Sequence, residues 1–150
     1  MSMTTVQVDQ ERLGALARKH GLDLVVLFGS QAKGRTHSGS DVDVAVRFRP
    51  GQRVAWHRKL DVASQLDSAF PDSGGVDVAF LNDASSLLLF EVAATGQALY
   101  ERQPLLFWQF QSYAARRYDD EHKFRLRRAA YLADWVKPWG PSKRRSSGRS

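Results

Sequence analysis

Three aspartates occupy positions from which their side chains could share a divalent cation. Asp41 and Asp43 open an alternating segment, residues 41–48, so both carboxylates point to one face of the predicted strand, about 6.6 Å apart along the backbone. Asp77 lies on the polar face of a second alternating segment, residues 76–81, whose other face carries Val76, Val78 and Phe80. Carboxylates held together repel one another, and a cation relieves that repulsion. Three aspartates without histidine or cysteine favour Mg²⁺, which bridges protein carboxylates to substrate phosphates, so the pattern predicts phosphoryl or nucleotidyl transfer.

A glycine-serine turn precedes the first aspartate pair and resembles a P-loop only at first sight. In the segment "VVLFGSQAKGRT", residues 25–36, Gly29 and Gly34 have P-loop spacing, but Arg35 replaces the lysine. A P-loop also opens a helix, whereas a Ser-Gly-Ser break at 38–40 and then a strand follow here. An isolated D-x-D pair is ordinary strand polarity. Its combination with this turn and a third aspartate predicts a phosphate and metal site.

The remaining pattern indicates an α+β or α/β fold that would position these residues. Hydrophobic periodicity and capping residues favour a small mixed sheet flanked by helices, with a helical C-terminal part. For the helix that ends before Pro71, the spacing predicts one apolar side made of Trp56, Leu60, Ala63, Leu66 and Phe70. Whether the C-terminal part is one helix or two stays open. The expected elements are a helix over 10–20, strands over 22–28, 41–48 and 76–81, and helices up to 70, over 84–95 and over 104–135.

Length and composition indicate one folded domain with a basic end. The chain has 150 residues, 43% of them hydrophobic, which suits a single core. We expect a core over 1–102, a helical segment over 103–136 packed on it, and a disordered tail over 137–150. The absence of cysteine excludes disulfides and thiolate metal sites. With no signal-peptide pattern and no long apolar run, we expect a soluble, cytoplasmic protein without a membrane contact.

The positive charge is concentrated in the tail. The formal net charge is +6, but five of the 22 basic residues lie in 137–150, so residues 1–136 carry 17 basic against 16 acidic side chains. A nearly neutral body argues against nucleic-acid binding as the main function. The tail has the composition of a solvated segment, for which we expect at most weak nucleic-acid contact.

These motifs resemble those of a known family. Gly29-Ser30, ten residues and then Asp41-x-Asp43 form the G-S-x10-D-x-D pattern of the minimal nucleotidyltransferases of the DNA polymerase β superfamily. The likeness covers about residues 9–101 and implies a polymerase-β-like nucleotidyltransferase core. Within that superfamily, "LLLFEVAATGQALYE" at 87–101 and "YAARRYDDEHKFRLRRAAYL" at 113–132 resemble the adenylyltransferase antitoxins that accompany HEPN-domain toxins.

The resemblance implies a reaction and roles for individual residues. AMP would pass from ATP to a hydroxyl acceptor, a tyrosine of a cognate HEPN toxin with which the chain would form a hetero-oligomer. Asp41 and Asp43 would hold Mg²⁺ against the triphosphate, and Asp77 would complete the site of a second Mg²⁺. The phosphates would be held by residues of the loop between the strands, for which the candidates are Gly29, Ser30, Lys33, Arg35 and Ser40.

Two other functions remain open at this point. An enzyme acting on a small molecule such as an aminoglycoside would need the same three aspartates, but such enzymes usually carry a larger C-terminal part. A protein that only binds and masks a toxin would need none of them. Arg47 lies on the same strand face as Asp43, where we expect it to form a surface ion pair.

Overall fold

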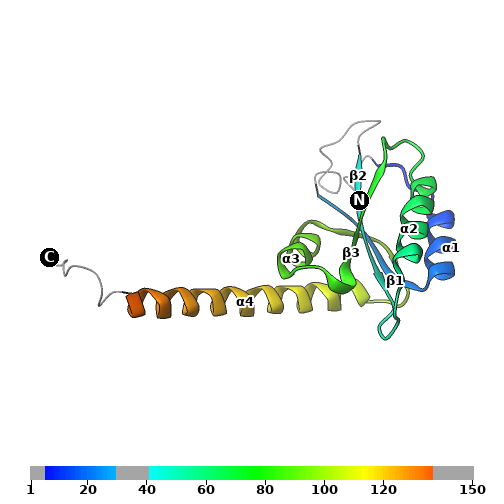
Figure 1. Cartoon of the computed structure of the whole chain (residues 1–150). Coiled ribbons are helices and arrows are strands. Elements are labelled where there is room, and N and C mark those ends of the chain that lie inside the picture. Colours follow the sequence, from blue (N-terminus) through cyan, green and yellow to red (C-terminus); the bar gives the residue numbers. More distant parts are fainter. Residues whose placement is uncertain (1–5, 30–40, 137–150) are drawn as a thin grey trace.

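The computed structural model of the chain describes residues 6–29 and 41–136, and in these residues helices cover both faces of one sheet (Figure 1). This arrangement is the small mixed sheet with flanking helices and a helical C-terminal part that the sequence predicts. The helices are α1 (Gln10–His20), α2 (Trp56–Leu66), η1 (Asp67–Ala69), η2 (Leu81–Asp83), α3 (Ser86–Thr95) and α4 (Leu106–Val136). The strands are β1 (Leu22–Phe28), β2 (Val42–Phe48), β3 (Val76–Phe80) and β4 (Gln97–Glu101).

The sheet has the order β3-β2-β1-β4 and is mixed. β1 is antiparallel to both β2 and β4, whereas β2 and β3 are parallel. All seven residues of β1 are buried, as expected for an interior strand with an apolar sequence. The sequence pattern predicts no strand after Gly96, but β4 is present there, so this prediction was wrong. The segment Gln97–Glu101 has only five residues, and their polarity does not alternate clearly enough to predict a strand.

Each face of the sheet packs against its own pair of helices. On one face, the apolar set of β2, which includes Val44 and Val46, packs with Leu13 of α1 and Leu66 of α2. On the other face, Ala45 packs in a second core with residues of α3 and α4. Since side chains alternate along a strand, Asp43 shares the face of Ala45. Asp43, the acidic residue of β2, therefore lies on the side of the sheet that α3 and α4 cover.

The helices agree with the sequence except on one face of α2. Asp9 caps α1 by accepting a hydrogen bond from the backbone N–H of Arg12 at 3.1 Å. In α2, however, Trp56 and Leu60 are 72% and 58% exposed, while Val62 and Leu66 are buried. Leu66 belongs to two apolar rows of α2 that both have helical spacing, one with Trp56 and Leu60 and one with Val62. The row with Val62 packs in the core against the sheet. The predicted apolar side is therefore buried at Leu66 and Phe70 but wrong at Trp56 and Leu60.

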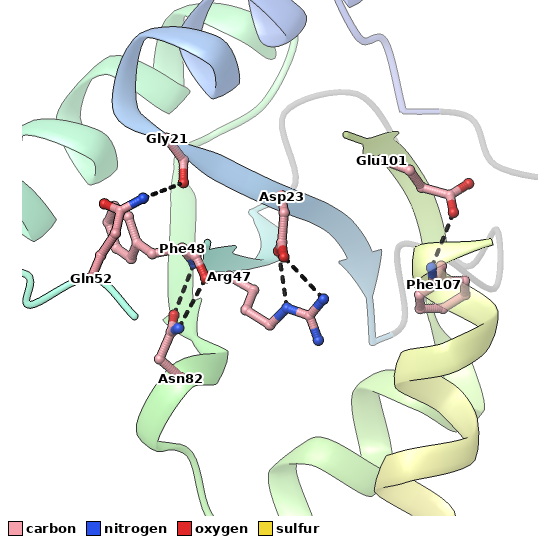
Figure 2. Close-up of polar contacts among 8 residues, drawn as sticks. All are labelled: Gly21, Asp23, Arg47, Phe48, Gln52, Asn82, Glu101 and Phe107. Carbon is pink, nitrogen blue, oxygen red and sulfur yellow. Dashed lines mark hydrogen bonds and ion pairs between the residues drawn. The ribbon is translucent and has the colours of Figure 1, made fainter. Parts of the chain in front are cut away.

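The C-terminal part is one continuous helix, α4, which starts on the core and runs out beyond it (Figure 1). Phe110 and Ala114 are buried against the second core. The backbone N–H of Phe107 donates to Glu101 Oε1 at 3.0 Å, which satisfies one of the free donors of the first turn (Figure 2). No helix in residues 6–29 and 41–136 is long and apolar enough to span a bilayer.

Polar contacts fix the end of β2 that lies away from Asp43 (Figure 2). Arg47 donates from Nε and Nη2 to the two carboxylate oxygens of Asp23, at 2.9 and 3.1 Å. The predicted ion pair of Arg47 exists, but its partner is only 1% exposed, so this pair belongs to the interior rather than to the surface. The side-chain amide of Asn82 accepts from the Phe48 N–H at 2.9 Å and donates to the Phe48 carbonyl at 3.0 Å. These bonds hold β2 to the segment that follows β3.

Candidate active site

The sheet places Asp43 and Asp77 side by side. They are register partners on the parallel strands β2 and β3. Partners in register on neighbouring strands project to the same face of a sheet. The expectation that Asp77 would join the acidic pair if the two strands were neighbours is therefore met by the topology, and neither side chain is among the buried residues.

Asp41 directly precedes β2, at the end of the strand pair where both β2 and β3 begin. The next residue, Val42, donates its backbone N–H to the Gly75 carbonyl at 2.9 Å, which ties the start of β2 to the start of β3. A Cβ added to Gly75 would lie 3.6 Å from Asp41 Oδ1, so the Asp41 carboxylate lies against this backbone. We refer to Asp41, Asp43 and Asp77 together as the carboxylate cluster.

Gly29 closes the site from the side of β1. Its φ of +77° lies in the left-handed region, and a Cβ at this position would come within 2.9 Å of Asp43 Oδ2. The turn therefore favours glycine, and any larger residue would also force the Asp43 carboxylate to move. The Gly29 N–H donates to Thr95 Oγ1 at 3.3 Å, and this hydroxyl donates to the Glu91 carbonyl at 2.9 Å. The turn is therefore anchored to α3.

The electrostatics of the site single out Asp43. Burial raises the pKa of Asp43 above its usual value, and the negative charges of Asp77, Glu91 and Asp41 raise it further. This is the repulsion that a bound cation would relieve, and the all-oxygen donor set suits a hard ion such as Mg²⁺. In the described part of the chain, no three His, Cys, Asp or Glu side chains already form a group that could hold a metal ion. The residues fit Mg²⁺ in chemistry, with the carboxylates still to be drawn together around it.

Glu91 and Thr95 were missed by the sequence analysis. They are four residues apart in α3 and so share one face of that helix, the face that meets Gly29 and Asp43. The signal available was this i, i+4 polar pair within an otherwise apolar helix. The other predicted phosphate-binding residues, Ser30, Lys33, Arg35 and Ser40, lie outside the described residues.

Comparison with known proteins defines the class of this fold and site. Residues 11–105 match the model of the polymerase beta nucleotidyltransferase family, and the chain belongs to that family. It is also similar to the protein adenylyltransferase MntA of Shewanella oneidensis, with 32% identity over 101 residues, or 65% of this chain and 68% of the relative. MntA of Aphanizomenon flos-aquae is 26% identical and is matched over 91% of this chain and 95% of its own length. Within its family, the chain thus groups with the MntA adenylyltransferases.

Solved structures agree with this assignment. A chain in a crystal structure of a toxin-antitoxin with AMP-PNP matches with a TM-score of 0.64 and 27% identity, covering 86% of this chain and 99% of the matched one. Another match, with a TM-score of 0.59 and 26% identity, covers 85% of this chain and 95% of the other. It belongs to the complex of a tri-AMPylated Shewanella oneidensis HEPN toxin with its MNT antitoxin. The chain therefore has the fold of nucleotidyltransferases that were solved in toxin complexes.

Proposed function

We propose that this protein is an antitoxin that transfers AMP from ATP to a tyrosine hydroxyl of a cognate HEPN toxin, with Mg²⁺ as cofactor. The observation that carries the proposal is the register of Asp43 with Asp77, next to Asp41 and the Gly29 turn. The support from relatives is that MntA proteins are named protein adenylyltransferases and that an AMPylated toxin occurs in a structural neighbour. The AMP-PNP in another neighbour supports ATP as the nucleotide.

The carboxylate cluster would hold two Mg²⁺ ions, with Asp41 and Asp43 on the side of the triphosphate and Asp77 on the side of the acceptor. When bound, Mg²⁺ supplies charge neutralisation at the phosphates and lowers the pKa of a coordinated hydroxyl. Gly29 contributes the turn rather than a donor, because its own N–H is engaged with Thr95. The phosphate donors would then come from the loop residues Ser30, Lys33, Arg35 and Ser40. In this scheme the tyrosine oxygen loses its proton and bonds to the α-phosphorus of ATP, the bond from the α-phosphorus to the β-phosphate oxygen breaks, and pyrophosphate leaves. The chain positions the reactants and compensates charge without a covalent intermediate.

Intact mass spectrometry tests the proposal directly. The protein is incubated with ATP, Mg²⁺ and the purified product of the adjacent gene, and both chains are weighed. A mass gain of one or more AMP units on the partner, mapped to a tyrosine by peptide sequencing, is the expected result. The Asp43→Asn variant should give no gain. Stable association without any mass change would instead indicate an antitoxin that acts by binding alone, and a gain on an added aminoglycoside would indicate a small-molecule enzyme.

A further inference from the structure

We propose that the outer segment of α4, defined as residues 122–134, is the surface that captures the toxin, through apolar side chains set among basic ones. This inference rests on the proposed function for the identity of the partner. It concerns the surface on which the partner binds, and neither the proposed reaction nor the carboxylate cluster identifies that surface.

The contacts of α4 with the rest of the fold end before this segment begins. Its first part is anchored by buried residues such as Phe110, and the Tyr118 ring stacks on Phe90 of α3 with centroids 4.4 Å apart. The last anchoring contact is a hydrogen bond from the buried Ser86 hydroxyl to Glu121. From His122 to Asp134 every side chain is exposed. Figure 1 shows the corresponding half of the helix running out past α3 without another element beside it.

The outer segment nevertheless carries large apolar side chains. The exposed fractions are 59% for Phe124, 58% for Leu126, 67% for Tyr131 and 48% for Leu132. Phe124, Tyr131 and Leu132 have the i, i+7, i+8 spacing of one helix face. A helix that leaves the core gains no stability from tertiary packing, and clustered exposed apolar side chains are typical of an interaction surface. The segment thus has the composition of an interface that is covered by a partner.

The charges of the segment describe that partner. Residues 122–134 contain four basic side chains, Lys123, Arg125, Arg127 and Arg128, against the single acidic residue Asp134. Lys123 and Arg125 form ion pairs along the helix with Asp119 and Glu121, at 3.1 and 3.8 Å, so we infer the charge of the partner mainly from Arg127 and Arg128. Arg127 and Arg128 lie three and four residues after Phe124, and therefore beside the apolar face. A complementary surface would be an apolar groove with an acidic rim. Buried aromatic rings provide most of the affinity in such interfaces, which selects a protein rather than a polyanion as the occupant.

The part of the chain that includes this helix is shared with chains from toxin complexes. The family model ends at residue 105, before α4. The match to the toxin-antitoxin chain covers 86% of this chain, about 129 residues, so at least about 24 of them must lie beyond residue 105. A part of the chain that the nucleotidyltransferase core does not include is thus shared with chains solved in toxin complexes.

The position of α4 also suits a capture role that is separate from the chemistry. The first part of α4 packs against α3, and α3 carries Glu91 and Thr95 beside the carboxylate cluster. A toxin held on the outer segment would be fixed relative to the carboxylates through α3. Substitutions in the outer segment should therefore weaken binding and raise the KM for the toxin while leaving kcat unchanged.

A pair of matched double variants tests this. Phe124→Ser with Tyr131→Ser removes two rings from the outer segment, and Trp56→Ser with Leu60→Ser removes two comparably exposed apolar side chains from α2. Binding to the adjacent-gene product is measured by biolayer interferometry in the Asp43→Asn background, which prevents modification of the partner. We expect the first pair to raise Kd at least about 10-fold and the second to change it less than about 2-fold. Arg127→Glu with Arg128→Glu should slow association and reduce its dependence on salt.

The outcomes separate this inference from the proposed function. Equal Kd values for the two double variants, or no binding of the adjacent-gene product by the unmodified chain, would overturn the inference. So would a dimer of the chain alone, seen by light scattering, that Phe124→Ser with Tyr131→Ser converts to a monomer, because a second copy would then be the occupant. Binding that depends on the outer segment, without any AMP transfer by the unmodified chain, would leave the inference standing and refute the reaction. Circular dichroism should show the same Tm in each of these variants as in the Asp43→Asn background that carries them.

Discussion

Asp43 on β2 and Asp77 on β3 lie side by side on one face of a parallel strand pair, although a helix and a loop separate them along the chain. The pairing concentrates negative charge at one place and raises the pKa of Asp43, for which burial is the largest cause. A structure that gathers carboxylates in this way gives up stability for function. The cost is measurable because one substitution removes it.

Asp43→Asn should raise the Tm of the metal-free protein at pH 7. The folded-state pKa of Asp43 lies above its unfolded value, so its stabilising contribution exists at low pH and is lost as the pH rises through the folded pKa. The gain in Tm should therefore shrink toward pH 4. Because the Asp43 side chain is only partly buried, solvent screening should keep the gain below about 1 kcal/mol, which corresponds to less than about 2–4 °C in a chain of this size. Scanning calorimetry in EDTA at both pH values measures it.

The same calorimetry can compare the effect of Mg²⁺ on the unmodified chain and on Asp43→Asn. Adding Mg²⁺ should raise the Tm of the unmodified chain and have less effect on Asp43→Asn, since a ligand stabilises only the state that binds it. Asp61→Asn, at an exposed position of α2, serves as the control and should show neither effect. A Tm that falls in Asp43→Asn at pH 7 would contradict this account of the site.

Gly29→Ala should destabilise the chain more than a glycine substitution that introduces backbone strain alone. Gly29 and Gly51 have φ values of +77° and +85°, but a Cβ at Gly29 meets Asp43 Oδ2 at 2.9 Å, whereas one at Gly51 meets nothing within 4 Å. We expect about 1 kcal/mol of lost stability for Gly51→Ala and about 2–3 kcal/mol for Gly29→Ala. Urea denaturation gives both values. Equal losses would mean that the contact with Asp43 is unimportant, and Asp43→Ala should reduce the excess cost of Gly29→Ala.

The sequence predicts the strand faces of the three aspartates better than the elements that surround them. Strict alternation in 41–48 and 76–81 defines strand faces by itself, which is why Asp41, Asp43 and Asp77 could be grouped before the sheet was known. Strand order was needed to bring Asp77 to Asp43, and alternation carries no information about order. The parallel pairing of β2 and β3 supplies it.

The errors of the sequence analysis have a common physical origin in tertiary contact. Trp56 and Leu60 fit a helical stripe, but the stripe through Val62 is the one that meets the sheet. β4 acquires its strand conformation by pairing with β1 rather than from its own pattern. Glu91 becomes part of the site only because α3 packs over the Gly29 turn. Local periodicity records which faces are apolar, but not which element will cover them.

Thr95→Val should lower AMP transfer while leaving the fold in place. Valine has the shape of threonine but cannot accept the hydrogen bond from the Gly29 N–H, which Thr95 Oγ1 accepts at 3.3 Å. We expect a loss of stability of about 1 kcal/mol and a roughly 10-fold lower kcat, because the turn beside Asp43 loses its anchor to α3. Thr95→Ser keeps the hydroxyl and should retain most of the activity. Steady-state transfer measured with labelled ATP distinguishes the two variants, and equal rates in both would remove Thr95 from the site.

Asp23→Asn should destabilise the whole domain without a specific effect on the chemistry. The Asp23 side chain is only 2% exposed and accepts two hydrogen bonds from Arg47, which also lies over the Phe110 ring at 5.9 Å. Removing one charge of a buried pair leaves the other without compensation and costs about 3 kcal/mol. Replacing both partners, as in Asp23→Leu with Arg47→Met, should cost less than the single change, because no uncompensated charge remains. Denaturant unfolding of the two variants tests this. If the double variant were the less stable one, the pair would be worth more than its desolvation cost, and the link that it forms between the sheet and α4 would be a main source of the stability of the fold.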